Sequence, residues 1–349
     1  MGIQKKKEID SSSLEDLIRK AGGCAVLDGG FATQLQKHGA SINNDPLWSA
    51  LYLIKDPDLL KRVHMEYLEA GADILVSSSY QATIPGFLSR GLSIEEAETL
   101  LKQSVKLAVD ARDKFWDSKK TIPGNTYNRA LVAASIGSYG AYLADGSEYS
   151  GKYGPNVDLN KLKDFHRRRL QVLVEAGPDL IAFETIPNKL EAQACVELVE
   201  EESVEIPSWI CFSSVDGENA PSGESFQEVL DVINQSNKIN AVGINCAPPH
   251  FILGLIQKFT KLTSKAIIVY PNSGEIYDGI AKRWLPSACF DDDKFEEFVP
   301  IWRDAGAKLI GGCCRTTPAT IRSISKVLKE RPQLSTVLIS SVQEMKAAD

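Results

Sequence analysis

Short runs of apolar residues recur along the chain, and most of them are followed by a stretch with helical periodicity. Eight such runs stand out, at residues 24–27, 72–76, 130–134, 179–183, 209–212, 241–244, 266–270 and 308–310. Strands that lack an alternating polar face are covered on both sides, as in parallel sheets flanked by helices. The pattern therefore predicts parallel strands inside a layer of helices.

The stretches between these runs show the 3.6-residue period of amphipathic helices. One buried helical face is predicted by the i, i+3, i+4, i+7 spacing of Phe226, Val229, Leu230 and Ile233. Eight strand-then-helix units in a chain of this size predict an α/β fold, a (β/α)8 barrel of the TIM type. We expect this barrel to form a single domain over residues 15–332.

The competing interpretation is a doubly wound open sheet. Its glycine-rich phosphate turn after the first strand is only half present here, as Asp28-Gly29-Gly30. The two ends of the chain, residues 1–14 and 333–349, are predicted to be flexible segments outside the domain.

The predicted strands are followed directly by polar and reactive residues. Those that end a strand are Asp28, Glu184, Cys246, Cys313 and Cys314. In a (β/α)8 barrel the functional residues lie at this C-terminal face, so the barrel hypothesis expects such a distribution. Two long loops, residues 137–158 and 271–287, belong to the same face, and loops of that length usually cover or bind a ligand.

Composition and charge narrow the range of partners. The chain has 349 residues and a formal net charge of −7 without a basic block, so neither nucleic acid nor an anionic membrane is an expected partner. No apolar stretch is long enough to span a bilayer, and the lysine-rich start has no apolar segment of a signal peptide behind it. The seven cysteines are too sparse for a disulfide framework, which favours a reducing, cytoplasmic location.

Three of the cysteines stand at the ends of two predicted strands. Cys246 follows the sixth strand, and Cys313 and Cys314 follow the eighth, where Gly311-Gly312 makes a bend possible. Three thiolates suit Zn²⁺ and leave its fourth position open for a substrate, which favours a catalytic zinc site. The alternatives are buried thiols that act as small apolar residues and a strained disulfide between the adjacent pair. The other cysteines are interpreted as core or incidental residues: Cys24, Cys195, Cys211 and Cys289.

Two acidic residues, Asp28 and Glu184, stand where a strand reaches the predicted mouth of the barrel. Two carboxylates beside an open site can hold the ammonium group of a substrate by charge-assisted hydrogen bonds. The alternatives are a loop cap at Asp28 and a structural ion pair at Glu184. The amides of Gly29, Gly30 and Phe31, at the start of the following helix, are candidates for binding a carboxylate.

Aromatic residues are frequent in the predicted mouth loops, at Tyr80, Tyr139, Tyr142, Tyr149 and Trp284. Aromatic rings attract onium cations. Tyr80, Tyr139 and Tyr142 are therefore candidates for binding a sulfonium or ammonium ligand. The alternative for each ring is packing within its own loop.

Four motifs, taken together and in this order, resemble the homocysteine S-methyltransferases: Asp28-Gly29-Gly30, Phe183-Glu184-Thr185, Gly243-Ile244-Asn245-Cys246 and Gly311-Gly312-Cys313-Cys314. The resemblance extends from about residue 18 to residue 332. It implies a homocysteine-binding (β/α)8 barrel with one zinc ion on Cys246, Cys313 and Cys314. Zinc would hold the thiolate of L-homocysteine, which takes up a methyl group to form methionine. Asn245 would join Asp28 and Glu184 in binding the substrate.

The methyl donor depends on finer features of the resemblance. Residues 135–149 resemble the branch that uses S-methylmethionine, with S-adenosylmethionine as a second sulfonium donor. The betaine-using branch, an alternative, carries Tyr where this chain has Thr185, and it has a C-terminal extension that builds its oligomer. We therefore expect a sulfonium donor and a monomer.

Two alternatives from other classes remain. A non-catalytic barrel could use zinc only to join two strands, although structural zinc is normally closed by four protein ligands and no fourth ligand is evident. A thiol redox enzyme could use Cys313 and Cys314 and bind no zinc.

Overall fold

The computed structural model describes residues 13–42, 45–278, 283–285 and 292–330. The predicted flexible ends fall largely on residues 1–12 and 331–349, which lie outside the described residues, as does Cys289.

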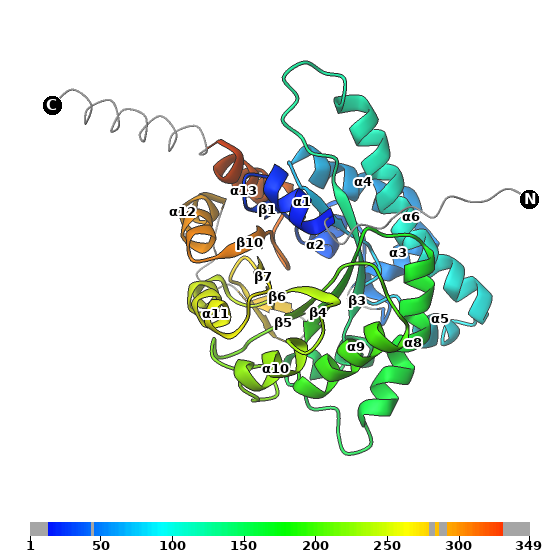
Figure 1. Ribbon diagram of the computed structural model, residues 1–349. Coiled ribbons are helices and arrows are strands. Elements are labelled where there is room, and N and C mark those ends of the chain that lie inside the picture. Colours follow the sequence, from blue (N-terminus) through cyan, green and yellow to red (C-terminus); the bar gives the residue numbers. More distant parts are fainter. Residues whose placement is uncertain (1–12, 43–44, 279–282, 286–291, 331–349) are drawn as a thin grey trace, which may run out of the picture.

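Eight parallel strands form one sheet that closes into a barrel (Figure 1). The strands are β1 Ala25–Val26, β2 Ile74–Val76, β3 Leu131–Gly137, β4 Leu180–Ile186, β5 Ser208–Phe212, β6 Ile239–Asn245, β7 Ala266–Tyr270 and β10 Ala307–Ile310. Their order is β1-β10-β7-β6-β5-β4-β3-β2, and a parallel bridge between Leu27 and Ile74 joins β1 to β2. The prediction of a (β/α)8 barrel is therefore confirmed, and the alternative of an open sheet is wrong. Each predicted apolar run overlaps one strand.

Helices follow the strands and surround the barrel (Figure 1). They are α1 Ser13–Lys20, α2 Phe31–Lys37, η1 Trp48–Leu51, α3 Tyr52–Lys55, α4 Pro57–Glu69, α5 Ile84–Leu88, α6 Ile94–Lys119, α8 Leu159–Glu175, α9 Lys189–Glu201, α10 Phe226–Ile233, α11 Pro249–Leu262, α12 Asp292–Asp304 and α13 Pro318–Glu330. The four apolar residues predicted for one helix face are all buried on α10, which Ser225 begins with a capping box. Within the described ranges, no helix has the length and apolar character needed to cross a bilayer.

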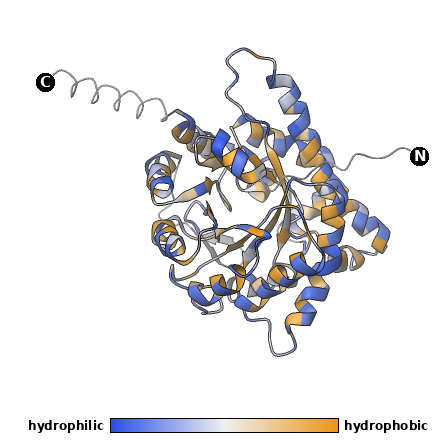
Figure 2. Ribbon diagram, in the orientation of Figure 1, coloured by the Kyte–Doolittle hydropathy of each residue, from blue (hydrophilic) through white to orange (hydrophobic). Residues whose placement is uncertain are grey.

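The core has two layers. Inward-facing side chains of the strands, such as Trp209, Ile268 and Leu309, fill the barrel, and Leu14 and Leu17 of α1 pack onto them. A second cluster lies between the strands and the surrounding helices. Figure 2 shows hydrophobic residues on the strands and on the inner helix faces, with hydrophilic residues outside. Strands covered on both sides explain the unbroken apolar runs of the sequence.

The two long loops at the C-terminal face are locally structured. Residues 137–158 contain the short helix α7 Tyr139–Leu143, which Ser138 caps, and the 3-10 helix η2 Ser147–Tyr149. Residues 271–287 contain an antiparallel hairpin of β8 Ile276–Asp278 and β9 Arg283–Leu285. The described parts of both loops therefore contain regular secondary structure.

Candidate functional site

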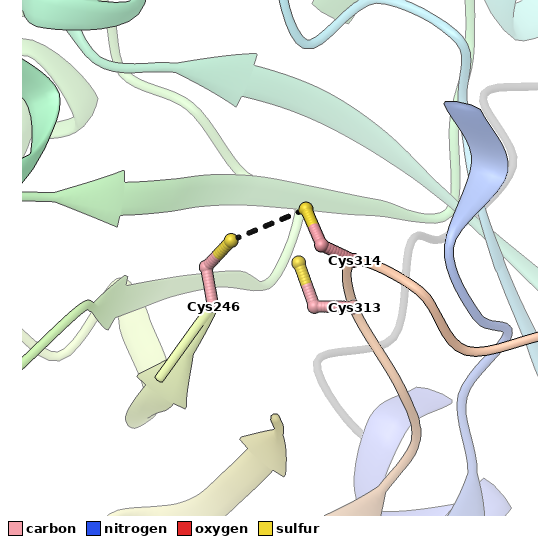
Figure 3. A group of neighbouring side chains, drawn as sticks. All are labelled: Cys246, Cys313 and Cys314. Atoms are coloured by element: carbon pink, nitrogen blue, oxygen red, sulfur yellow. Dashed lines mark hydrogen bonds between the residues drawn. The ribbon is translucent and has the colours of Figure 1, made fainter. Parts of the chain in front are cut away.

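Three cysteine side chains meet at the mouth of the barrel (Figure 3). Cys246 follows β6, whereas Cys313 and Cys314 follow β10, and β7 lies between these two strands in the sheet. The three Sγ atoms lie within 4.8 Å of one another, and those of Cys246 and Cys314 are 3.6 Å apart. The structure thus brings together the thiols that the sequence singled out. All three are free cysteines, so no disulfide joins the adjacent pair.

Close contacts between strand ends fix the backbone around these thiols. A Cβ atom on Gly311 would lie 2.6 Å from the Cβ atom of Leu27, and one on Gly312 would lie 2.2 Å from Oγ1 of Thr316. The glycine pair is therefore required by lack of space, since neither glycine has a positive φ. Cys246 itself adopts the left-handed region, with a φ of 53°, which turns the chain out of β6.

The three thiols differ in their pKa values because they are hydrogen-bonded to one another. Hydrogen bonds from the thiols of Cys313 and Cys314 hold the pKa of Cys246 well below its usual range. The pKa values of Cys313 and Cys314 are raised, first because their protons are held in the hydrogen bonds to Cys246. Cysteine that binds a metal is deprotonated, so a cation between the sulfur atoms would replace these protons. The cluster has the donor set of a site for a soft metal.

The thiols open onto a cavity of about 520 Å³ at the C-terminal ends of the strands. Its carboxylate residues are Asp28, Asp45, Glu148 and Glu184. Among the residues that the structure describes, no lysine, arginine or histidine lines this cavity. Acidic walls of low dielectric concentrate cations, so the cavity suits positively charged ligands.

Asp28 and Glu184, the predicted ammonium-binding pair, both line the cavity and are only 5% and 6% exposed. Oδ2 of Asp28 accepts a hydrogen bond from the backbone N–H of Val76 at 2.8 Å, and Glu184 accepts one from the hydroxyl of Ser135. Burial raises the pKa of Asp28 well above its usual value and that of Glu184 to about 7. An ammonium group between them would lower both pKa values by supplying positive charge.

Asn245 lines the cavity, but its side chain is hydrogen-bonded to Thr185. Oδ1 of Asn245 accepts the backbone N–H of Thr185 at 2.9 Å, and Nδ2 donates to Oγ1 of Thr185 at 2.8 Å. Thr185 has a φ of 55°, which is unusual for a β-branched residue. In this arrangement Asn245 supports the site indirectly, by holding the end of β4 beside Glu184.

One of the predicted carboxylate-binding amides already has a partner. The N–H of Gly30 donates to Oγ1 of Thr316 at 3.0 Å, and a Cβ atom on Gly30 would lie 2.5 Å from the carbonyl oxygen of Cys313. Gly30 therefore packs the end of β1 against the loop that carries two thiols. Gly29 and Phe31 also line the cavity.

The predicted cation-binding aromatic residues are divided between the cavity and the loop interior. Tyr80 lines the cavity, where its hydroxyl donates to Oε2 of Glu148 at 3.3 Å. Tyr139 and Tyr142 lie outside it, on α7, and both rings pack against Phe165 of α8, with centroids 4.9 and 5.2 Å away. The structure does not bring these two rings to the site, because α7 directs them toward α8.

The cavity also contains residues that the sequence analysis did not assign. Glu148 lies on η2 beside Tyr149, whose hydroxyl oxygen is 3.9 Å from Sγ of Cys246. The position of Glu148 directly before Tyr149, a tyrosine of a predicted mouth loop, is a sequence signal that could have identified it. Trp48, at the start of η1, also lines the cavity, although no predicted strand end precedes it. The side chain of Trp284, on β9, lies outside the described residues.

Comparison with known proteins covers almost the whole chain. The family model described as homocysteine S-methyltransferase matches residues 25–328. Homocysteine S-methyltransferase 1 of Brassica oleracea var. italica is 75% identical over 331 residues, or 95% of this chain and 100% of the relative. The enzyme of the same name from Arabidopsis thaliana has the same identity and coverage. The metallated crystal structure of the homocysteine methyltransferase MmuM from Escherichia coli has a TM-score of 0.76 and 37% identity, covering 88% of this chain and 96% of that one. The chain therefore belongs to the homocysteine S-methyltransferase family, as its four motifs predicted.

Proposed function

We propose that this chain transfers a methyl group from S-methylmethionine to the thiol of L-homocysteine and so forms methionine. The observation that carries this proposal is the convergence of three thiols on a cavity lined by Asp28 and Glu184. The family supports homocysteine as the acceptor, since the plant relatives bear the name homocysteine S-methyltransferase. S-adenosylmethionine is a second, slower donor in this proposal.

Zn²⁺ fits the thiol cluster. Tetrahedral zinc with Zn–S bonds of about 2.3 Å places its sulfur ligands about 3.8 Å apart. The Sγ atoms of Cys246 and Cys314 are 3.6 Å apart, and the related MmuM structure is described as metallated. In the described part of the chain the cluster has three protein ligands, so one position is left for substrate. When bound, Zn²⁺ keeps a substrate thiol deprotonated at neutral pH, although a free thiol has a pKa of about 8.5.

The acidic pair of the chain would hold homocysteine by its ammonium group. Asp28 and Glu184 accept charge-assisted hydrogen bonds from it, and their contacts with Val76 and Ser135 fix the orientation of both carboxylates. Burial strengthens this attraction, because little water screens it. The amides of Gly29 and Phe31 stay candidates for the substrate carboxylate.

Methyl transfer between two sulfur atoms requires acceptor, methyl carbon and leaving group to be in line. The bond from the methyl carbon to the donor sulfur breaks as the bond to the homocysteine sulfur forms, and a neutral thioether leaves. With S-methylmethionine, both products are methionine. The rings of Tyr80 and Tyr149 line the same cavity as the thiols and suit a sulfonium cation.

A panel of donors tests the proposed reaction. Zinc-loaded protein is mixed with homocysteine and with S-methylmethionine, S-adenosylmethionine or betaine, each with an isotope-labelled methyl group, and labelled methionine is measured. We expect the highest rate with S-methylmethionine, a lower rate with S-adenosylmethionine and none with betaine. Transfer from betaine alone would support the betaine-using alternative, and no transfer from any donor would overturn the proposal.

Three further expectations stay predictions. The predicted domain limits, 15–332, enclose the family match at 25–328. A monomer is tested by sedimentation equilibrium, and a cytoplasmic location by imaging a tagged copy of the full chain. A stable dimer or an organellar signal would contradict these two expectations.

A further inference from the structure

Glu148 is an acidic residue of the cavity to which the proposed chemistry gives no role. Oε2 of Glu148 accepts a hydrogen bond from the hydroxyl of Tyr80, and the next residue, Tyr149, reaches to 3.9 Å from Sγ of Cys246. The carboxylate of Glu148 therefore lies close to both Tyr80 and the thiol of Cys246. Asp28 and Glu184 come from other parts of the mouth, after β1 and near the end of β4.

The charge of Glu148 has no cationic partner among the described residues. The remaining cavity acid, Asp45, is paired with Arg90, whereas the partners of Glu148 are the neutral hydroxyls of Tyr80 and Tyr149. Burial raises the pKa of Glu148 to about 7. A partly buried carboxylate without a cationic partner is destabilised, and a bound cation offsets that cost.

The segment that carries Glu148 is held in place before any ligand binds. Oε1 of the fully buried Glu191 accepts the backbone N–H of Tyr139 at 2.6 Å, and Oε2 accepts the hydroxyl of Tyr153. Nε2 of His166 lies 2.8 Å from the same Oε1 atom. Both ends of the loop are therefore fixed to α9. A pre-organised contact residue loses little conformational entropy when its ligand binds.

A sulfonium donor that is an amino acid carries two positive charges, one on the sulfonium and one on the α-ammonium group, and only the first is lost in the reaction. The sulfonium charge disappears as the methyl group leaves, so a carboxylate beside it would stabilise the ground state more than the transition state. The α-ammonium charge is unchanged by the reaction, so a carboxylate there stabilises both states equally. Aromatic rings such as that of Tyr80 hold a sulfonium without a fixed negative charge.

We propose that Glu148 binds the α-ammonium group of the methyl donor and so selects donors that are amino acids. This inference rests on the proposed methyl transfer and deepens it. S-methylmethionine and S-adenosylmethionine carry the required ammonium group. Betaine and simple sulfonium carboxylates do not.

The test compares Glu148→Gln with the matched control Asp145→Asn, an exposed acid of the same loop whose Oδ1 accepts the N–H of Ser147. Both substitutions remove one charge and keep the shape of the side chain. The donors are S-methylmethionine and dimethylsulfoniopropionate, a sulfonium carboxylate without an amino group, which is assayed as donor and as competitive inhibitor.

We expect Glu148→Gln to raise KM for S-methylmethionine about tenfold or more, because a charge-assisted hydrogen bond is lost, with kcat nearly unchanged. KM for homocysteine and the affinity for dimethylsulfoniopropionate should stay at wild-type values. Asp145→Asn should change none of these quantities. Glu148→Asp keeps the charge, so it should raise KM for S-methylmethionine less than Glu148→Gln does.

Two results would overturn the inference while leaving the proposed function intact. One is an unchanged KM for S-methylmethionine in a folded Glu148→Gln protein. The other is an equal loss with both sulfonium compounds, which would place Glu148 beside the sulfonium. Calorimetric titration with S-methylmethionine alone measures the affinity for the donor, and so tests the contact between Glu148 and the donor ammonium group without methyl transfer. A wild-type protein that binds this donor but transfers no methyl group would contradict only the proposed function.

Discussion

Asn245 and Thr185 are joined by two hydrogen bonds, of 2.8 and 2.9 Å, across the mouth of the barrel. Asn245 directly precedes Cys246, and Thr185 directly follows Glu184. Strand β5 lies between β4 and β6, so this contact reaches over it. The strand end that carries a thiol and the strand end that carries a carboxylate are therefore fixed relative to each other.

Replacing Asn245 with Ala should weaken both folding and homocysteine binding. The buried N–H of Thr185 would lose its partner and the hydroxyl of Thr185 would lose one of its hydrogen bonds, at a cost of about 1–3 kcal/mol in the free energy of unfolding. The left-handed backbone beside Glu184 would also relax, so KM for homocysteine should rise. Asn240→Ala, at the other end of β6, is the control and should leave this KM unchanged. Equal KM values in the two variants would contradict the positioning role.

Each of the clustered cysteines should be required for metal binding. Cys246→Ser, Cys313→Ser and Cys314→Ser replace a soft sulfur ligand with a hydroxyl, and we expect zinc affinity to fall by about 100-fold or more. Zinc content per chain and methyl transfer are measured side by side. The control is Cys195→Ala, which replaces a buried cysteine on α9 outside the cluster. This variant should bind as much zinc as the wild-type protein. A serine variant with full activity and no zinc would exclude the metal from the reaction.

Homocysteine binding should strengthen as the pH rises through about 7, the pKa to which burial raises Glu184. Below this pH the carboxyl group keeps its proton and cannot attract an ammonium group, and above it the negative charge is present. We therefore expect kcat/KM for homocysteine to fall on the acid side, and Glu184→Gln to remove this dependence. The same shift makes the unliganded fold less stable, relative to Glu184→Gln, as the pH rises from 4.5 to about 7. A pH profile of Glu184→Gln that matches the wild type would assign the titration to another group.

Gly243→Ala should disrupt the sheet on which the thiols depend. A Cβ atom at this position would lie 1.8 Å from the carbonyl oxygen of Ile268, which is backbone of β7 and cannot turn away. We expect the free energy of unfolding to fall by about 3 kcal/mol or more, measured by urea denaturation. Gly254→Ala is the control, because a Cβ atom there meets nothing within 4 Å on α11. That substitution should be neutral or should stabilise the protein by about 1 kcal/mol.

Features that depend on local pattern were predictable from the sequence. The eight strands follow from apolar runs, and Asp28, Glu184 and Cys246 follow from their place at strand ends. The path of the loop after β3 was not predictable in this way. Its course is set by Glu191, which is 52 residues from Tyr139, and that contact cannot be read from spacing. For the same reason, proximity in sequence did not separate Tyr149, beside a thiol, from Tyr142, which packs on α8.

The position of the thiols also sets the moment at which the protein can acquire its metal during synthesis. Cys314 lies 68 residues after Cys246 and follows β10, the strand that pairs with both β1 and β7. A ribosome must therefore release nearly the whole barrel before three sulfur ligands can meet. A nascent chain that stops before β10 carries one of them and has no strand between β1 and β7. A retained metal ion would thus report that β10 has been synthesised and that the ring of strands has closed.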